Sequence, residues 1–169
     1  LESSSTPSES SAKQGSALET LETLAIKGRA PKTGYDRDLF SDGWGSWNGC
    51  DWRNRILTRD LVQIDFRDDC IVESGVLQDP YTGKNIAFVR GVQTSLAVQI
   101  DHVVAVSDAW QKGAQQLTSA ERYSFYNDPL NLLAVDGPTN GAKGDGDAAT
   151  WLPPNKGFRC QYVARQVAV

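Results

Sequence analysis

The apolar run Leu96–Val106, with the sequence LAVQIDHVVAV, constrains the fold more than any other part of the chain. A run of this length that is rich in Val and Ile is typical of a strand buried in a core. It contains the polar pair Asp101 and His102, and His102 is the only histidine in the sequence. A buried charged pair is costly unless it is paired, binds a ligand or lies at a strand end beside a cleft. On this pair alone, a structural histidine and a functional one explain the sequence about equally well.

Length and composition favour one globular domain. The chain has 169 residues, of which 40% are hydrophobic and 22% charged, and its net charge is −4. No apolar run approaches the ~18 residues that a membrane-spanning helix needs. Residues 1–16 are rich in Ser and nearly free of apolar side chains, so we expect a flexible tether there and the domain over 17–169. The sequence lacks Met, so we expect either that a leader has been removed, as on export, or that the sequence is a fragment of a longer chain.

The remaining pattern predicts a small α+β domain. Four segments suit helices, with a second helix start expected at Thr118 inside the third: 17–26, 50–61, 107–126 and 158–169. Four segments suit strands: 69–76, 85–90, 96–106 and 131–135. The Gly-rich stretch 136–146 can open a further helix.

Two asparagines follow the Asp-His pair at informative distances. Asn131 lies 29 residues beyond His102 and begins a predicted strand, and Asn140 lies 9 residues further on in the sequence TNGAKGD. In this order and spacing, Asp101-His102, Asn131 and Asn140 resemble the motif of the HNH nucleases, whose active site is a ββα-metal finger.

The resemblance extends over most of the chain, residues 17–169. The segments GCDWRNRIL, DPYTGK, IDHVVAVSDAWQKGA and NDPLNLLAVDGPTNGAKGDGDAATWLPP resemble a secreted actinobacterial branch of HNH proteins. That branch is related to the nuclease domain of restriction enzymes that cut glucosylated DNA. Similar proteins continue past the equivalent of Val169 and carry another Cys there.

The resemblance implies a role for each residue of the motif. His102 is the general base, since a neutral imidazole suits proton transfer near neutral pH. Asp101 and Asn140 are ligands of one divalent cation, Mg²⁺ or Mn²⁺, and Asn131 braces the loop that carries the histidine. Adjacent residues of an extended strand point in opposite directions, so Asp101 and His102 can share one site only if the strand bends there.

Three basic residues are candidates for substrate contact. Lys143 could contact phosphate beside the metal, and a solvated loop lysine is an equally good interpretation. Arg55 and Arg59 share a helix face and could follow the DNA backbone. For these two arginines, ion pairs with Asp51 or Asp60 are the better interpretation.

The three cysteines allow one disulfide and leave an odd thiol. We expect Cys50 and Cys70 to pair, because such a link would join a helix to the adjacent sheet, whereas three reduced thiols are the alternative. In similar proteins the partner of Cys160 lies beyond this chain, so here we expect it to be free.

We therefore expect a secreted or cell-surface-tethered, metal-dependent endonuclease that cleaves DNA with little sequence specificity, and RNA is a second candidate substrate. We expect a monomer with no membrane span and no protein partner. Two alternatives stay open. One is a modified-DNA restriction or toxin nuclease of the same fold, and the other is a catalytically silent binding module at the cell surface.

Overall fold

The computed structural model describes residues 16–169, so the expected tether lies outside the described residues except for Ser16. Ser16 is the N-cap of the first helix, where its hydroxyl accepts a hydrogen bond from the Glu19 N–H. Six α-helices follow: α1 (Ala17–Thr23), α2 (Trp52–Asp60), α3 (Val106–Gln111), α4 (Ser119–Tyr126), α5 (Gly137–Lys143) and α6 (Arg159–Ala168). Four short 3₁₀ helices are η1 (Arg37–Leu39), η2 (Thr94–Ala97), η3 (Ala114–Gln116) and η4 (Lys156–Phe158).

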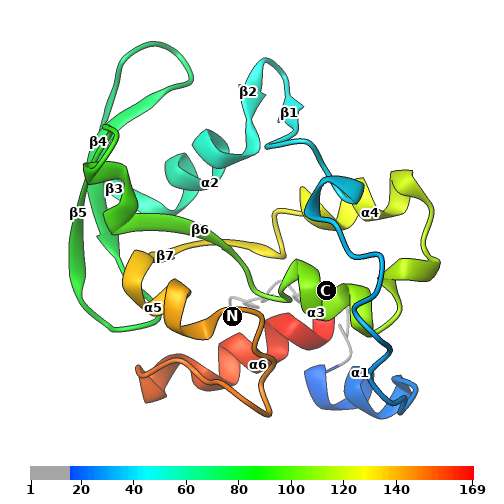
Figure 1. Cartoon of the computed structure of the whole chain (residues 1–169). Helices are drawn as coiled ribbons and strands as arrows, with labels where there is room; N and C mark the ends of the chain where they lie inside the picture. Colours follow the sequence, from blue (N-terminus) through cyan, green and yellow to red (C-terminus); the bar gives the residue numbers. More distant parts are fainter. Residues whose placement is uncertain (1–15) are drawn as a thin grey trace, which may run out of the picture.

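The strands form three small antiparallel sheets, which confirms the predicted α+β class (Figure 1). The first pairs β1 (Ser46–Trp47) with β2 (Cys50–Asp51). The second is a three-stranded meander of β3 (Leu61–Phe66), β4 (Val72–Gln78) and β5 (Asn85–Val89). The third pairs β6 (Val98–His102) with β7 (Leu132–Asp136).

The third sheet and α5 together form a ββα unit. β6 and β7 pair with Asp101 opposite Leu133 and His102 opposite Leu132, and α5 begins directly after β7. The Asp136 side chain caps α5 by accepting a hydrogen bond from the Thr139 N–H at 2.9 Å. A Cβ at Gly137 would lie 2.0 Å from the carbonyl oxygen of Leu96, so only glycine lets α5 start this close to η2.

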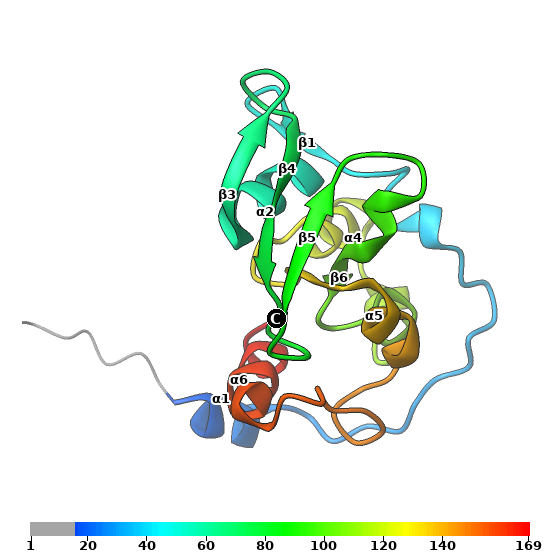
Figure 2. The ribbon, with the colours of Figure 1, turned by 90° about the vertical axis from the view of Figure 1, so that its left-hand side faces the viewer.

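The core lies on both faces of the β6–β7 sheet. Val98 and Ile100 of β6 pack into a cluster with α2 and the meander, while Val103 and Leu133 belong to a cluster with α6. A third cluster joins α3 and α4 to the segment that precedes β1. In Figure 2, α1 and α6 lie together at one end of the molecule, and the far end of the meander lies at the other.

Several elements differ from the prediction. β1 and β2 were not predicted, and the helix expected from Cys50 begins at Trp52, so Cys50 lies in β2 and not on the helix.

Two further strands also differ. The strand expected over 96–106 is only β6, because η2 precedes it and α3 already begins at Val106. β3 was not predicted. Only Leu61 of this strand is buried and Gln63 has a positive φ of 52°, so the strand lacks the regular alternation that identifies a half-buried strand. Pairing with β4 places it in the sheet. The predicted helix start at Thr118 is confirmed by a capping box with Glu121.

The predicted disulfide is confirmed. Cys50 and Cys70 are bonded, with their Cα atoms 5.6 Å apart, and the link joins β2 to the turn before β4. Cys160 on α6 is a free, exposed thiol. Over residues 16–169, none of the helices has the length and apolar character that crossing a membrane requires.

Candidate active site

His102 is the last residue of β6, and its imidazole is almost fully buried, with 4% of the residue exposed. Its Nε2 lies 2.8 Å from the main-chain carbonyl oxygen of Tyr126. A carbonyl can only accept a hydrogen bond, so Nε2 carries the proton and Nδ1 keeps its lone pair. The ring is stacked on Trp44, with the ring planes 7° apart, and it packs against the Tyr126 ring. These contacts fix both the tautomer and the orientation of the imidazole.

The segment that carries Trp44 is held against α4. The Gly45 N–H donates a 2.9 Å hydrogen bond to the Asn127 side chain, and a Cβ at Gly45 would lie 2.2 Å from the Tyr123 hydroxyl. A larger residue at this position would have to displace the Tyr123 side chain. The contact keeps Trp44 over the histidine ring.

The environment of His102 keeps the imidazole neutral. Burial lowers the pKa of His102 to about 3, and the positive charge of Arg37 acts in the same direction. The hydrogen bond to the Tyr126 carbonyl opposes this shift. At neutral pH the ring is therefore an uncharged base with an unprotonated Nδ1, and a terminal nitrogen of Arg37 lies 3.4 Å from that atom.

Asn131 lies immediately before β7 and is completely buried. Its side-chain oxygen accepts a 2.8 Å hydrogen bond from the Val104 N–H, and the Val103 N–H donates to its main-chain carbonyl. Asn131 therefore fixes the backbone just after His102.

The side chain of Asp101 forms a buried ion pair with Lys143. The Lys143 ammonium lies 2.8 Å and 2.7 Å from the two carboxylate oxygens, and it also donates to the His102 carbonyl at 2.7 Å. The Tyr81 hydroxyl donates to the same carboxylate. Burial raises the pKa of the Asp101 carboxyl, and the charge of Lys143 opposes that shift.

The expected convergence of Asp101, His102 and Asn140 does not occur. β6 does not bend at its end, so Asp101 faces α5 while His102 lies on the opposite face. Asn140 donates instead to Gln99 at 3.0 Å. Both Asp101 oxygens are engaged by the Lys143 ammonium, so the residues in this arrangement do not fit a divalent cation at Asp101. Across the described part of the chain, no three His, Cys, Asp or Glu side chains gather to hold a metal.

The basic residues also differ from their expected surface roles. The Lys143 side chain is fully buried, so it is not placed to contact a phosphate. Arg59 pairs with Asp60 at 2.6 Å and donates to two main-chain carbonyls, as the alternative interpretation predicted. Arg55 lies over the Trp47 ring at 4.2 Å. In this structure, neither arginine contacts His102.

Comparison with known proteins agrees with the ββα geometry. Residues 51–169 match the family described as "GmrSD restriction endonucleases, C-terminal domain". This chain belongs to that family. The GmrSD C-terminal domains are nuclease domains of the HNH type.

A relative from Arthroderma benhamiae covers nearly the whole chain. It is named "Uncharacterized secreted protein" and is 35% identical over 156 residues, which are 90% of this chain and 73% of the relative. No solved structure is similar enough to count as a match.

In this GmrSD-type domain the sequence motif missed three residues around the histidine, which are Arg37, Trp44 and Tyr126. They come from the irregular stretch before β1 and from the end of α4, outside the motif. The concentration of Gly and aromatic residues between Pro31 and Gly49 was the available signal, because such a stretch orders only when it packs on another element.

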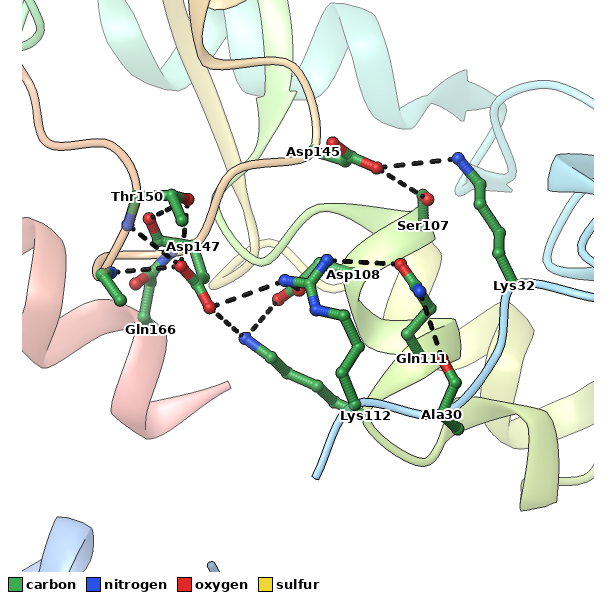
Figure 3. Close-up of polar contacts among 12 residues, drawn as sticks. Ala30, Lys32, Ser107, Asp108, Gln111, Lys112, Asp145, Asp147, Thr150 and Gln166 are labelled. Carbon is green, nitrogen blue, oxygen red and sulfur yellow. Dashed lines mark hydrogen bonds and ion pairs between the residues drawn. The ribbon is translucent and has the colours of Figure 1, made fainter. Parts of the chain in front are cut away.

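A second polar cluster lies between α3 and the loop after α5 (Figure 3). Its three carboxylates are each paired with a cationic side chain, and the pKa of Asp147 falls to about 2, chiefly through its hydrogen bond from Lys112. The cluster therefore fastens the segment after α1 to α3 and is not a free acidic site. The closest pairs are Arg29–Asp108, Lys112–Asp147 and Lys32–Asp145, at 2.6, 2.6 and 3.6 Å.

Proposed function

We propose that this chain is a nuclease that hydrolyses phosphodiester bonds of DNA, with His102 as the general base. The observation that carries the proposal is the hydrogen bond from His102 Nε2 to the Tyr126 carbonyl, which leaves an unprotonated Nδ1 at the end of the ββα strand. Membership in a family of nuclease domains supplies the reaction class.

In the proposed reaction, a water molecule beside Nδ1 attacks the phosphorus atom while its proton passes to the imidazole. Asn131 holds the backbone after His102, so the ring does not have to reorganise as the proton moves. Because the carboxylate of Asp101 is already neutralised by Lys143, no step of the proposal passes through a metal at that residue.

The proposal also covers the substrate of the nuclease and the place where the protein acts. We propose DNA as the substrate, with little sequence selectivity, and membership in the GmrSD family makes modified DNA the second substrate to test. We also propose that the protein is secreted, because the chain carries a disulfide and its relative is named as secreted.

Cleavage assays on two kinds of DNA test this function. The purified chain is incubated with unmodified and with glucosylated linear DNA, in separate reactions that contain Mg²⁺, Mn²⁺ or EDTA. We expect new fragments from at least one substrate. Intact DNA of both kinds in every buffer would reject the nuclease and leave the surface binding module as the better interpretation.

A further inference from the structure

The positive charge of Arg37 lies beside the candidate base. Its side chain is exposed, and within residues 16–169 no carboxylate forms a salt bridge with it. The neighbouring Asp36 carboxylate instead accepts a hydrogen bond from the Asp38 N–H. The guanidinium contacts the side chains of Tyr126 and His102, and it also interacts with the Tyr35 hydroxyl, so none of these partners is a carboxylate.

Tyr126 positions Arg37 and His102 together. The Arg37 Nε donates to the Tyr126 hydroxyl at 3.2 Å, and the guanidinium lies 5.1 Å from the centre of the same ring. The main-chain carbonyl of Tyr126 accepts the hydrogen bond from His102. One residue at the end of α4 therefore fixes the cation and the base relative to each other.

The guanidinium also covers the functional nitrogen of the histidine. One terminal nitrogen of Arg37 lies 3.4 Å from His102 Nδ1, which is longer than an ordinary N–H hydrogen bond. A bond from arginine to a phosphate oxygen is charge-assisted and stronger than this contact. A phosphate that reaches the exposed Arg37 side chain would therefore draw the guanidinium away from Nδ1.

We propose that Arg37 binds the phosphodiester anion of the substrate and that this binding uncovers His102 Nδ1 for the attacking water. This inference rests on the proposed nuclease function. Arg37 donates hydrogen bonds to a non-bridging phosphate oxygen, where negative charge accumulates in the transition state. The water oxygen bonds to phosphorus and its proton passes to Nδ1. The ester P–O bond breaks, and the departing oxygen keeps the electron pair and takes a proton from solvent.

Binding measurements separate this role from a structural one. In a His102→Ala background, which prevents turnover, the affinity for a short fluorescent DNA duplex is measured by anisotropy over a series of salt concentrations. We expect Arg37→Gln to weaken binding about five- to tenfold and to reduce the slope of log K against log salt by about one. Arg67→Gln is the matched control, because Arg67 pairs with Glu73 and lies outside the site, and we expect no change from it.

Each outcome is decisive. If DNA binds but Arg37→Gln and Arg67→Gln have the same affinity and salt slope, the role of Arg37 is wrong while the nuclease proposal stands. If the His102→Ala protein and the otherwise unchanged protein both fail to bind or cleave DNA, the nuclease proposal fails and the role of Arg37 fails with it. In the active protein, Arg37→Lys keeps the positive charge that Arg37→Gln removes, but it lacks the planar guanidinium. We expect it to keep the thermal stability and to recover only part of kcat/KM.

Discussion

The Nε2–H of His102 donates a 2.8 Å hydrogen bond to the main-chain carbonyl of Tyr126, which is 24 residues away in sequence. The partner is a carbonyl, so the contact decides which ring nitrogen is protonated. Since β6 supplies the histidine and the end of α4 supplies the carbonyl, the basic nitrogen is set by how these two elements pack. The chemistry of the site therefore depends on tertiary structure as much as on the histidine itself.

The buried imidazole should make stability depend on pH. The pKa of His102 is about 3 in the folded chain, below the ordinary value of 6.5, so between these values the unfolded chain binds a proton that the folded chain does not. Stability should therefore fall as pH falls from about 6.5 towards 3, by up to about 1.4 kcal/mol for each pH unit. Urea unfolding between pH 7.5 and 4.5 measures this slope.

His102→Gln provides the comparison for that slope, because the chain has no other histidine. Carboxylates titrate in both proteins, so the difference between the two curves isolates the imidazole. Parallel curves for the two proteins would show that His102 is not held neutral by the fold.

The ion pair of Lys143 with Asp101 should be a major contribution to stability. Lys143→Met leaves a buried carboxylate without its cation, and removing one partner of a buried pair costs about 3–5 kcal/mol. The double variant Asp101→Asn/Lys143→Met removes both charges and should recover part of that loss. Urea unfolding measures both variants, and a loss below about 1 kcal/mol for Lys143→Met would contradict the buried pair.

Much of this fold could be predicted because local signals agree with it. The capping box at Thr118 and the turn between β4 and β5 are encoded by a few adjacent residues. The ββα unit was expected on other grounds, because the resemblance of Asp101-His102, Asn131 and Asn140 to the HNH motif implied it. The helix cap and the turn depend on adjacent residues, so they can be predicted without knowledge of the tertiary contacts.

The surroundings of the site could not be predicted in the same way. Nothing in the sequence near Lys143 indicates that its ammonium turns inward to Asp101 rather than outward to a phosphate. The placement of Arg37 and Trp44 at His102 depends on a loop whose path is fixed by long-range contacts to α4. The spacing of residues in the sequence specifies neither the partner of a side chain such as Lys143 nor the face of the strand or helix on which it lies.

The disulfide should be a second stabilising link. Its two cysteines are 20 residues apart, and by the chain-entropy estimate a loop of that size contributes on the order of 3 kcal/mol. We expect Cys50→Ser to lower the free energy of unfolding by about this amount. Cys160→Ser is the control and should change it by less than about 0.5 kcal/mol, because that thiol is free and exposed. Equal stability of the two variants would contradict a structural role for the link.

The rate of supercoiled plasmid cleavage by His102→Ala, relative to the unchanged chain, shows whether His102 is the general base. Both proteins are first shown to be folded by circular dichroism, and Cys160→Ser serves as a control variant that should retain full activity. If His102 is the general base, its removal should slow nicking by about 10²- to 10⁴-fold. If folded His102→Ala nicks the plasmid at a rate within a few-fold of the unchanged chain, His102 is not the general base.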